Sequence, residues 1–156
     1  MGTRYLTKSQ FKLARECPAK LYYTGKSEYA NHKLEDSFLF ALAEGGFQVG
    51  ELAKCYISGG VEVETLDYEQ SIKETNELLE RDNVIIYEAT FRHKSLLIRA
   101  DIIKKTGNKI ELIEVKAKSI DSSNVVLRGR NGIKPEWRAY LEDIAFQKYV
   151  VSKAFP

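Results

Sequence analysis

Two carboxylates and one ammonium group interrupt an otherwise apolar stretch between residues 96 and 118. The runs LLIRADIIKK and KIELIEVKAK contain Asp101 in the first and Glu114 and Lys116 in the second. Strands covered on both faces are nearly continuous Val, Ile and Leu, and an ionised group there is costly unless a partner or a metal compensates it. These three residues are therefore the first candidates for chemistry.

The spacing predicts that the three charged groups lie close together. Side chains alternate along a strand, so Glu114 and Lys116 share one face. If the two runs pair through their short turn, Asp101 lies on the neighbouring strand at the same end of the sheet. The alternative is a salt-bridged polar patch on a half-exposed sheet.

Carboxylate oxygens select hard cations such as Mg²⁺ or Mn²⁺ over Zn²⁺. A metal ion held by Asp101 and Glu114 could bind a phosphate oxygen and lower the pKa of a bound water, and Lys116 could orient that water or offset transition-state charge. This is the chemistry of phosphodiester hydrolysis. The chain has no Gly-x-Ser-x-Gly elbow, Walker-type loop, dinucleotide fingerprint or plausible Cys/His dyad.

A long helix is predicted over residues 36–56, and it offers further acidic groups. Glu44, Gln48 and Glu51 form one polar stripe, while glycines at 45, 46 and 50 remove bulk beside it. The glycines suggest close approach of another backbone or a ligand, or else a solvated helix face with a local kink. The apolar positions at helical spacing are Phe38, Leu42, Val49, Leu52, Ala53 and Tyr56.

The remaining elements form an ordered series. We expect a helix that begins after Thr7 or Ser9 and ends at Pro18, a short edge strand over 61–65, and a helix over 68–80 capped by Asp67. Strands over 84–91, 96–104 and 109–118 and a helix over 136–152 follow. Glu88 lies in the first of these strands on the face of Ile86 and Thr90, where it could bind a ligand or metal or pair with Arg92 or Arg99.

Charge is distributed unevenly along the chain. Residues 1–83 carry 10 Lys and Arg against 14 Asp and Glu, a balance of −4, and residues 84–156 carry 14 against 8, a balance of +6. A basic glycine-rich loop that contains Arg128, Arg130 and Lys134 could grip phosphates, or could be only a mobile crossover. The basic half favours a nucleic-acid partner, although +6 is also within reach of ordinary surface.

Composition indicates one globular domain of 156 residues. No apolar stretch is long enough to span a membrane, and the first residues lack an apolar signal core. Two cysteines, Cys17 and Cys55, form no Cys-x-x-Cys pair and no disulfide framework. We therefore expect a soluble cytoplasmic protein without a membrane partner.

Asp101 followed by Glu114-Val115-Lys116 on the next strand, after a helix, resembles the signature of the PD-(D/E)XK nuclease superfamily. The order of elements is most similar to its RecB-like branch, which includes the CRISPR-associated exonucleases. The segments Leu6-Thr7-Lys8-Ser9 with Cys17-Pro18, and the run EGGFQVGELA at 44–53, look like the N-terminal nuclease-like domain of a larger bacterial family of uncharacterised function.

The resemblance implies Asp101, Glu114 and Lys116 as catalytic residues, with Glu51, or less well Glu44, as a third metal ligand beside Asp101 and Glu114. Gln147 would match the glutamine of a Gln-x-x-x-Tyr motif in substrate binding, but Val151 stands where the tyrosine belongs. Glu88 and the basic loop residues would also contact substrate. Tyr140 and Asp143 share the helix face of Gln147.

The resemblance also implies a restriction-endonuclease-like α-β-β-β-α core, a mixed sheet flanked by helices, with extra N-terminal helices. The family's last strand would follow the final helix, so we expect a fragment of a longer protein or a strand supplied by an oligomer or partner domain. Iron–sulfur members use one early and three late cysteines; Cys17 fits the first and the late ones are missing. No cluster is expected from this chain alone.

The leading hypothesis is a nuclease that depends on Mg²⁺ or Mn²⁺ and hydrolyses phosphodiester bonds in DNA. The alternative is a catalytically inactive nuclease-like module that binds nucleic acid or a protein partner. The third hypothesis is a purely structural or protein-interaction domain whose charged residues form ion pairs at the end of the sheet.

Overall fold

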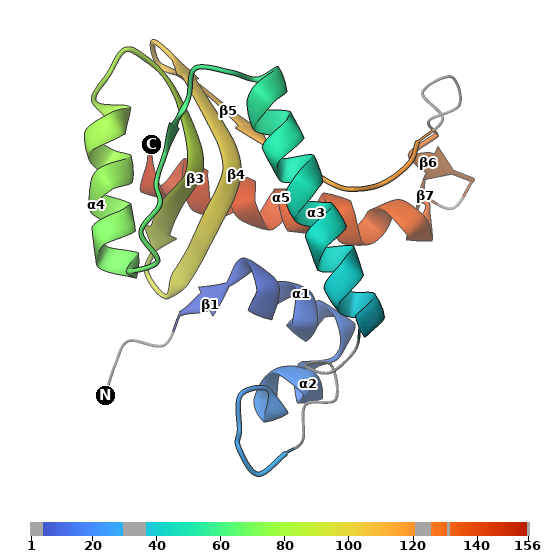
Figure 1. The fold of residues 1–156 in the computed structure, drawn as a ribbon. Coiled ribbons are helices and arrows are strands. Elements are labelled where there is room, and N and C mark those ends of the chain that lie inside the picture. The colour runs from blue at the N-terminus through green and yellow to red at the C-terminus, as the bar shows by residue number, and fades with distance from the viewer. Residues whose placement is uncertain (1–4, 30–36, 121–125, 131, 156) are drawn as a thin grey trace.

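The computed structural model describes residues 5–29, 37–120, 126–130 and 132–155, and it shows an α/β fold with a mixed, curled sheet flanked by helices (Figure 1). In chain order the elements are β1 (Leu6–Thr7), α1 (Lys8–Glu16), α2 (Pro18–Tyr23), α3 (Ser37–Tyr56), β2 (Val61–Glu62), α4 (Tyr68–Leu79), β3 (Asn83–His93), β4 (Leu96–Thr106), β5 (Lys109–Ile113), β6 (Arg128–Gly129), β7 (Gly132–Ile133) and α5 (Pro135–Ala154). The predicted α/β class is confirmed, and the predicted helices and strands follow one another in the predicted order; β1, α2, β6 and β7 were not predicted.

The sheet is organised around the long antiparallel pair of β3 and β4. Strand β5 continues antiparallel from one edge of β4, β1 pairs parallel with β4 at Leu96 and Leu97, and β2 pairs parallel with β3. Leu6 and Thr7 are thus brought beside the middle of the chain.

Strand β5 is shorter than predicted: it ends at Ile113, whereas the prediction continued to residue 118. A competing hydrogen bond explains the early end. The backbone N–H of Val115 donates to Asp101 Oδ2 at 2.8 Å instead of to a ladder carbonyl. Glu114 and Lys116 therefore follow the strand rather than lie within it.

The alternation of β3 changes phase at Glu88. Val84 and Ile86 belong to the buried core on one side of this residue, and Ala89 and Phe91 on the other. Glu88 itself has a φ of 57°, in the left-handed region that a residue with a Cβ seldom adopts. The ladder pairs on either side, Tyr87 with Ile102 and Ala89 with Ala100, place Glu88 opposite Asp101. The two acidic residues therefore interrupt the buried pattern at the same point of the curled sheet.

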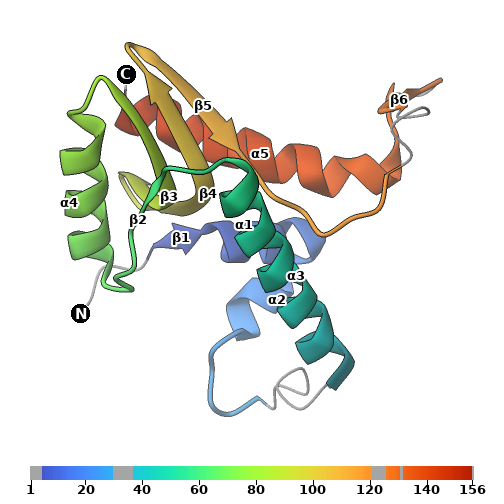
Figure 2. The same cartoon turned by 45° about the horizontal axis from the view of Figure 1, so that its top comes forward.

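Helices α4 and α5 cover the sheet, as Figures 1 and 2 show. Asp67 caps α4 as predicted, and α5 contributes Phe146, Val150 and Val151 to the core. Phe11 of α1 stacks on Phe146 with ring centroids 4.3 Å apart. In the described part of the chain, none of the helices combines the length and the apolar character that a membrane span requires.

Helix α3 forms as predicted, although its predicted start at residue 36 lies outside the described residues. Its apolar positions at helical spacing are not buried in the described structure, since Leu42, Leu52 and Tyr56 are 56%, 66% and 92% exposed. A Cβ at Gly45, Gly46 or Gly50 would have no atom of the described residues within 4 Å. Close approach of another described backbone segment therefore does not account for these glycines.

Tyr87 of β3 fastens the end of α3 to the sheet. Its hydroxyl donates to Ile57 O at 2.5 Å and accepts from the backbone N–H of Gly60 at 3.1 Å. A Cβ at Gly60 would overlap the Tyr87 ring, whereas the surroundings of Gly45 are open. The turn after α3 therefore requires glycine at position 60.

Gly60→Ala should lower the free energy of unfolding by about 1–3 kcal/mol, since the ring and the turn must move apart. Gly45→Ala is the matched control, and it should leave stability unchanged or raise it by up to about 1 kcal/mol because alanine favours a helix. Urea denaturation measures both. Equal effects of the two substitutions would contradict the packing argument.

Candidate active site

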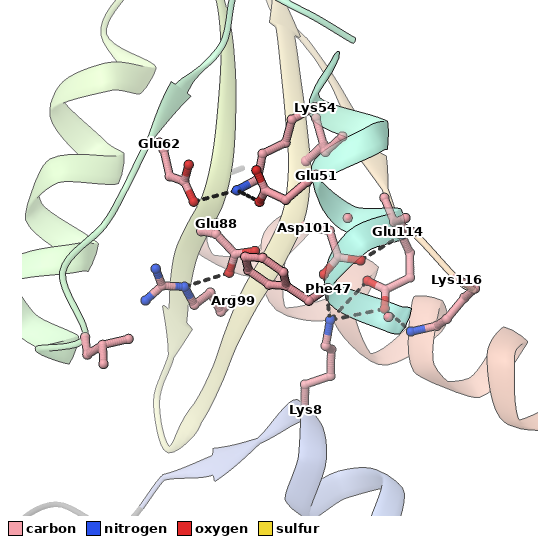
Figure 3. Close-up of a pocket in the computed structure, with 15 residues that line it drawn as sticks. Lys8, Phe47, Glu51, Lys54, Glu62, Glu88, Arg99, Asp101, Glu114 and Lys116 are labelled. Atoms are coloured by element: carbon pink, nitrogen blue, oxygen red, sulfur yellow. Dashed lines mark hydrogen bonds and ion pairs between the residues drawn. The ribbon is translucent and has the colours of Figure 1, made fainter. Parts of the chain in front are cut away.

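A cleft of about 580 Å³ opens between α3, the middle of β3 and β4, and the segment after β5 (Figure 3). Its charged lining residues are Lys8, Glu51, Lys54, Glu62, Glu88, Arg99, Asp101, Glu114 and Lys116. Five carboxylates and four cationic groups thus share one concave surface, and ion pairs divide them into three clusters.

The first cluster contains the three predicted catalytic residues. Asp101, Glu114 and Lys116 line the same end of the cleft, and Lys116 forms an ion pair with Glu114. Lys8 completes the cluster: its Nζ lies 3.2 Å from Asp101 Oδ1 and 3.1 Å from Glu114 Oε1. Figure 3 shows this ammonium reaching from the start of α1 to a position between the two carboxylates.

Glu114 is the most enclosed of these residues, with a side chain 7% exposed. Gln147 of α5 donates from Nε2 to Glu114 Oε2 at 2.7 Å and is itself fully buried. The Gln147 amide therefore fixes the orientation of the Glu114 carboxylate. The contact of Gln147 with substrate stays a prediction; in this structure its Nε2 group is engaged by Glu114.

Lys116 lies between two acids. Besides Glu114, its Nζ lies 3.1 Å from Asp143 Oδ2, and Asp143 is only 1% exposed. Asp143 also accepts from Gln147 at 3.3 Å through Oδ1. Two residues of α5 thus fix the ammonium and the carboxylate that the sequence placed on one face.

The protonation states follow from these contacts. Burial by itself raises the pKa of the Glu114 carboxyl, but the hydrogen bond from Lys116, the charge of Lys8 and the hydrogen bond from Gln147 together hold that pKa below its ordinary value. Burial lowers the pKa of Lys116, and its bonds to Glu114 and Asp143 outweigh the burial and raise it. Both groups are therefore charged at neutral pH.

Glu51, the predicted third metal ligand, belongs to a second cluster. Its carboxylate pairs with Lys54 at 2.8 Å, and Lys54 also pairs with Glu62 at 2.6 Å. Glu51 lines the same cleft, but the structure does not bring it into contact with Asp101 or Glu114. Glu44, the weaker candidate, is exposed on α3 and does not line the cleft.

The third cluster is an ion pair between Glu88 and Arg99, with Arg99 Nε 2.8 Å from Glu88 Oε2. Arg99 also donates to the backbone carbonyls of Val63 and Thr65. Of the two readings of Glu88, the internal ion pair is the one that this structure contains, and its partner is Arg99.

The predicted basic loop lies away from the cleft. Arg128 and Arg130 are exposed on or beside the short hairpin of β6 and β7, and Lys134 precedes α5. Figure 1 places this hairpin at the end of α5 far from the sheet. Residues 121–125 and 131 of the loop are outside the described part.

No site role was predicted for Lys8, Lys54 or Asp143. For Lys8, its position in the first helix is a local indication of a site role. It occupies the first position of α1, directly after the Thr7 cap, where the positive end of the helix dipole disfavours a cation. Lys54 has a sequence-local partner in Glu51, three residues earlier, whereas the ion pair of Asp143 with Lys116 joins residues that are distant in sequence.

The donor chemistry of Asp101 and Glu114 fits Mg²⁺ or Mn²⁺, because hard cations prefer carboxylate oxygens and one cationic group already lies between these two. The wider ligand set is incomplete. Among the described residues, no group of three His, Cys, Asp or Glu side chains is placed to hold one metal ion.

No known protein-family model, curated protein or solved structure gives a significant match to the chain. The resemblance to PD-(D/E)XK nucleases therefore rests on the sequence motif and the predicted order of elements alone.

Glu114 should contribute to stability above the ordinary glutamate pKa of about 4.3, and this contribution should be lost as pH falls through the lower pKa of the folded state. Glu114→Gln should therefore lower the free energy of unfolding at pH 7 by about 1–3 kcal/mol and flatten its decline in acid. Urea denaturation between pH 7 and pH 3 measures both effects.

Glu111→Gln is the matched control, because Glu111 lies on β5 and pairs with Lys109 in solvent. Screening by water and salt should leave its acid dependence closer to that of the wild type. The same flattening in both variants would contradict a special role for the enclosed carboxylate.

Proposed function

We propose that this chain is a divalent-metal-dependent nuclease domain that hydrolyses phosphodiester bonds in DNA. The observation that carries the proposal is the convergence of Asp101, Glu114 and Lys116 at one end of an open cleft, with a cationic group bridging the two carboxylates. A fold of the restriction-endonuclease type and membership of the PD-(D/E)XK superfamily belong to the same proposal.

Each residue of the cluster has a role that its contacts support. Asp101 and Glu114 would hold Mg²⁺ or Mn²⁺, which when bound supplies a Lewis acid and an activated water. Gln147 fixes the orientation of Glu114. Lys116, with 30% of its side chain exposed, would present a positive charge to a phosphate group while Asp143 restrains it from behind.

The charge distribution favours a polyanionic substrate recognised through its backbone. The balance of +6 over residues 84–156 includes the hairpin cations Arg128 and Arg130, which do not line the cleft. A ligand that contacts the cleft and these hairpin cations at the same time must extend beyond the cleft. Such contacts favour a nucleic-acid polymer over a mononucleotide. Such binding should weaken steeply with salt.

A second function is favoured by a specific observation. The ammonium of Lys8 lies between Asp101 and Glu114, and the described residues offer no third ligand there. Such an arrangement also suits a nuclease-like module that binds nucleic acid, or a protein partner, without cutting. The two functions differ in whether metal addition produces cleavage.

Cleavage of end-labelled single- and double-stranded DNA with Mg²⁺ or Mn²⁺ should be detectable for the wild-type chain. Asp101→Asn, Glu114→Gln and Lys116→Met should each lower the rate about 100-fold or more, because each removes a charge at the reacting phosphate. Glu111→Gln and Lys109→Ala are matched controls on the exposed part of β5, and both should cut like the wild type.

DNA binding without metal-dependent cutting would select the inactive binding module. Cutting that persists in all three cluster variants would show that a contaminating nuclease or another site is responsible, and it would refute the assignment of these residues.

A further inference from the structure

Lys8 is held at its position by the backbone on both sides. Leu6 and Thr7 pair with Leu96 and Leu97 of β4, and the backbone N–H of Leu6 donates to Ser95 O at 2.7 Å. The Thr7 and Gln10 side chains form a reciprocal capping box around the start of α1. The position of the Lys8 backbone is therefore set by the fold, independently of what its side chain contacts.

A lysine at this helix position is electrostatically unfavourable unless something offsets it. The first turn of α1 contains no acidic residue, and the helix dipole is positive at this end. The Asp101 and Glu114 carboxylates supply the offset, although they lie 93 and 106 residues away along the chain.

The oxygen atoms that face Lys8 are the ones that a metal ion would use. Asp101 Oδ2 accepts from the backbone N–H of Val115, and Glu114 Oε2 accepts from Gln147. Lys8 Nζ lies 3.2 Å from Asp101 Oδ1, 3.1 Å from Glu114 Oε1 and 3.2 Å from Glu114 Oε2, and Lys116 also pairs with Glu114 Oε1. A cation that bridged Asp101 Oδ1 and Glu114 Oε1 would occupy the place of the Lys8 ammonium.

We infer that Lys8 is a tethered cation that competes with a divalent metal ion for the oxygens between Asp101 and Glu114. This inference rests on the proposed metal-dependent function and specifies its loading step. Mg²⁺ binds carboxylate oxygens at about 2.1 Å, so an ion between the two acids and an ammonium at the same point exclude each other. Lys8 has a flexible side chain that is 22% exposed, and it leaves the pair by rotating toward the cleft.

The first test measures Mn²⁺ affinity by isothermal titration calorimetry on the wild type, Lys8→Met and Lys12→Met. Lys8→Met should bind Mn²⁺ about tenfold more tightly or better, since the competing charge is gone. Lys12 is the matched control: it lies one turn later on α1, is half-exposed, and reaches Asp143 at 3.9 Å rather than the acid pair. Its removal should change the affinity by less than about threefold.

The second test uses the wild-type chain and is unaffected by misfolding of a variant. Lysine acylation followed by mass spectrometry should label Lys8 slowly without metal and several times faster with saturating Mn²⁺, while Lys109 is labelled equally in both. Lys8 labelling that stays unchanged when Mn²⁺ binds would overturn the inference. So would equal affinity gains in Lys8→Met and Lys12→Met, or no Mn²⁺ binding by Lys8→Met.

The inference and the proposed function fail in different ways. Tight Mn²⁺ binding by Lys8→Met with no cutting of any nucleic acid would remove the nuclease and keep the competition. Metal-dependent cutting by the wild type, with Mn²⁺ affinity independent of Lys8, would do the reverse.

Discussion

The enclosed carboxylate of Glu114 is the constraint on which the arrangement of this structure depends. A charged group with 7% exposure cannot remain ionised without several partners. Three separate parts of the chain supply them: Lys8 from the start of α1, Lys116 from the segment after β5, and Gln147 from α5. The first helix, the sheet and the last helix are thus joined at one charged point as well as through the apolar contacts of the core.

Asp101 connects that point to the shape of the sheet. By accepting from the Val115 N–H, it ends β5 at Ile113, directly before Glu114. Glu88, opposite Asp101 in the register, marks the place where the strands change phase. The residues that interrupt the apolar pattern in the sequence are the ones at which the regular ladder is interrupted in space, and the cleft opens there.

The sequence predicted the features that depend on local chemistry. The cap at Thr7, one of two predicted candidates, and the cap at Asp67 follow from the capping preference of their side chains, and the meeting of Asp101, Glu114 and Lys116 follows from strand alternation and a short turn. The predicted end of the strand over 109–118 was wrong because the Asp101 side chain accepts the Val115 N–H in place of a ladder carbonyl. The apolar positions of α3 are exposed, because helical spacing identifies an apolar face without identifying what covers it.

The contacts of Lys8 and Asp143 could not be predicted in the same way. The ion pairs of Lys8 with Asp101 and Glu114, and of Asp143 with Lys116, join residues that are close only after the chain has folded. A lone lysine or aspartate on a helix resembles a solvated surface residue. Gln147 illustrates the intermediate case. The motif placed it correctly near the site, but only the packing of α5 shows that its amide is directed at Glu114.

If the cluster binds a metal ion as proposed, the balance between Lys8 and that ion decides what the cluster can do. A divalent ion at about 2.1 Å has about three times the Coulomb attraction to a carboxylate oxygen that an ammonium has at 3.1 Å in the same dielectric. The metal ion must lose part of its hydration shell to bind, and Mg²⁺ does so reluctantly, whereas Lys8 is already in place and loses only a tethered contact. If the cost of dehydrating the metal ion exceeds its extra attraction to the carboxylates, Lys8 remains paired with the two acids and holds α1 on the sheet. If the extra attraction exceeds the dehydration cost, the same two carboxylates become a metal site. The displaced ammonium is then an additional positive charge at the cleft where a phosphate would bind. Under the proposal, the function of the cluster thus depends on one exchange of cations, since Val115 holds Asp101 Oδ2 and Gln147 holds Glu114 Oε2.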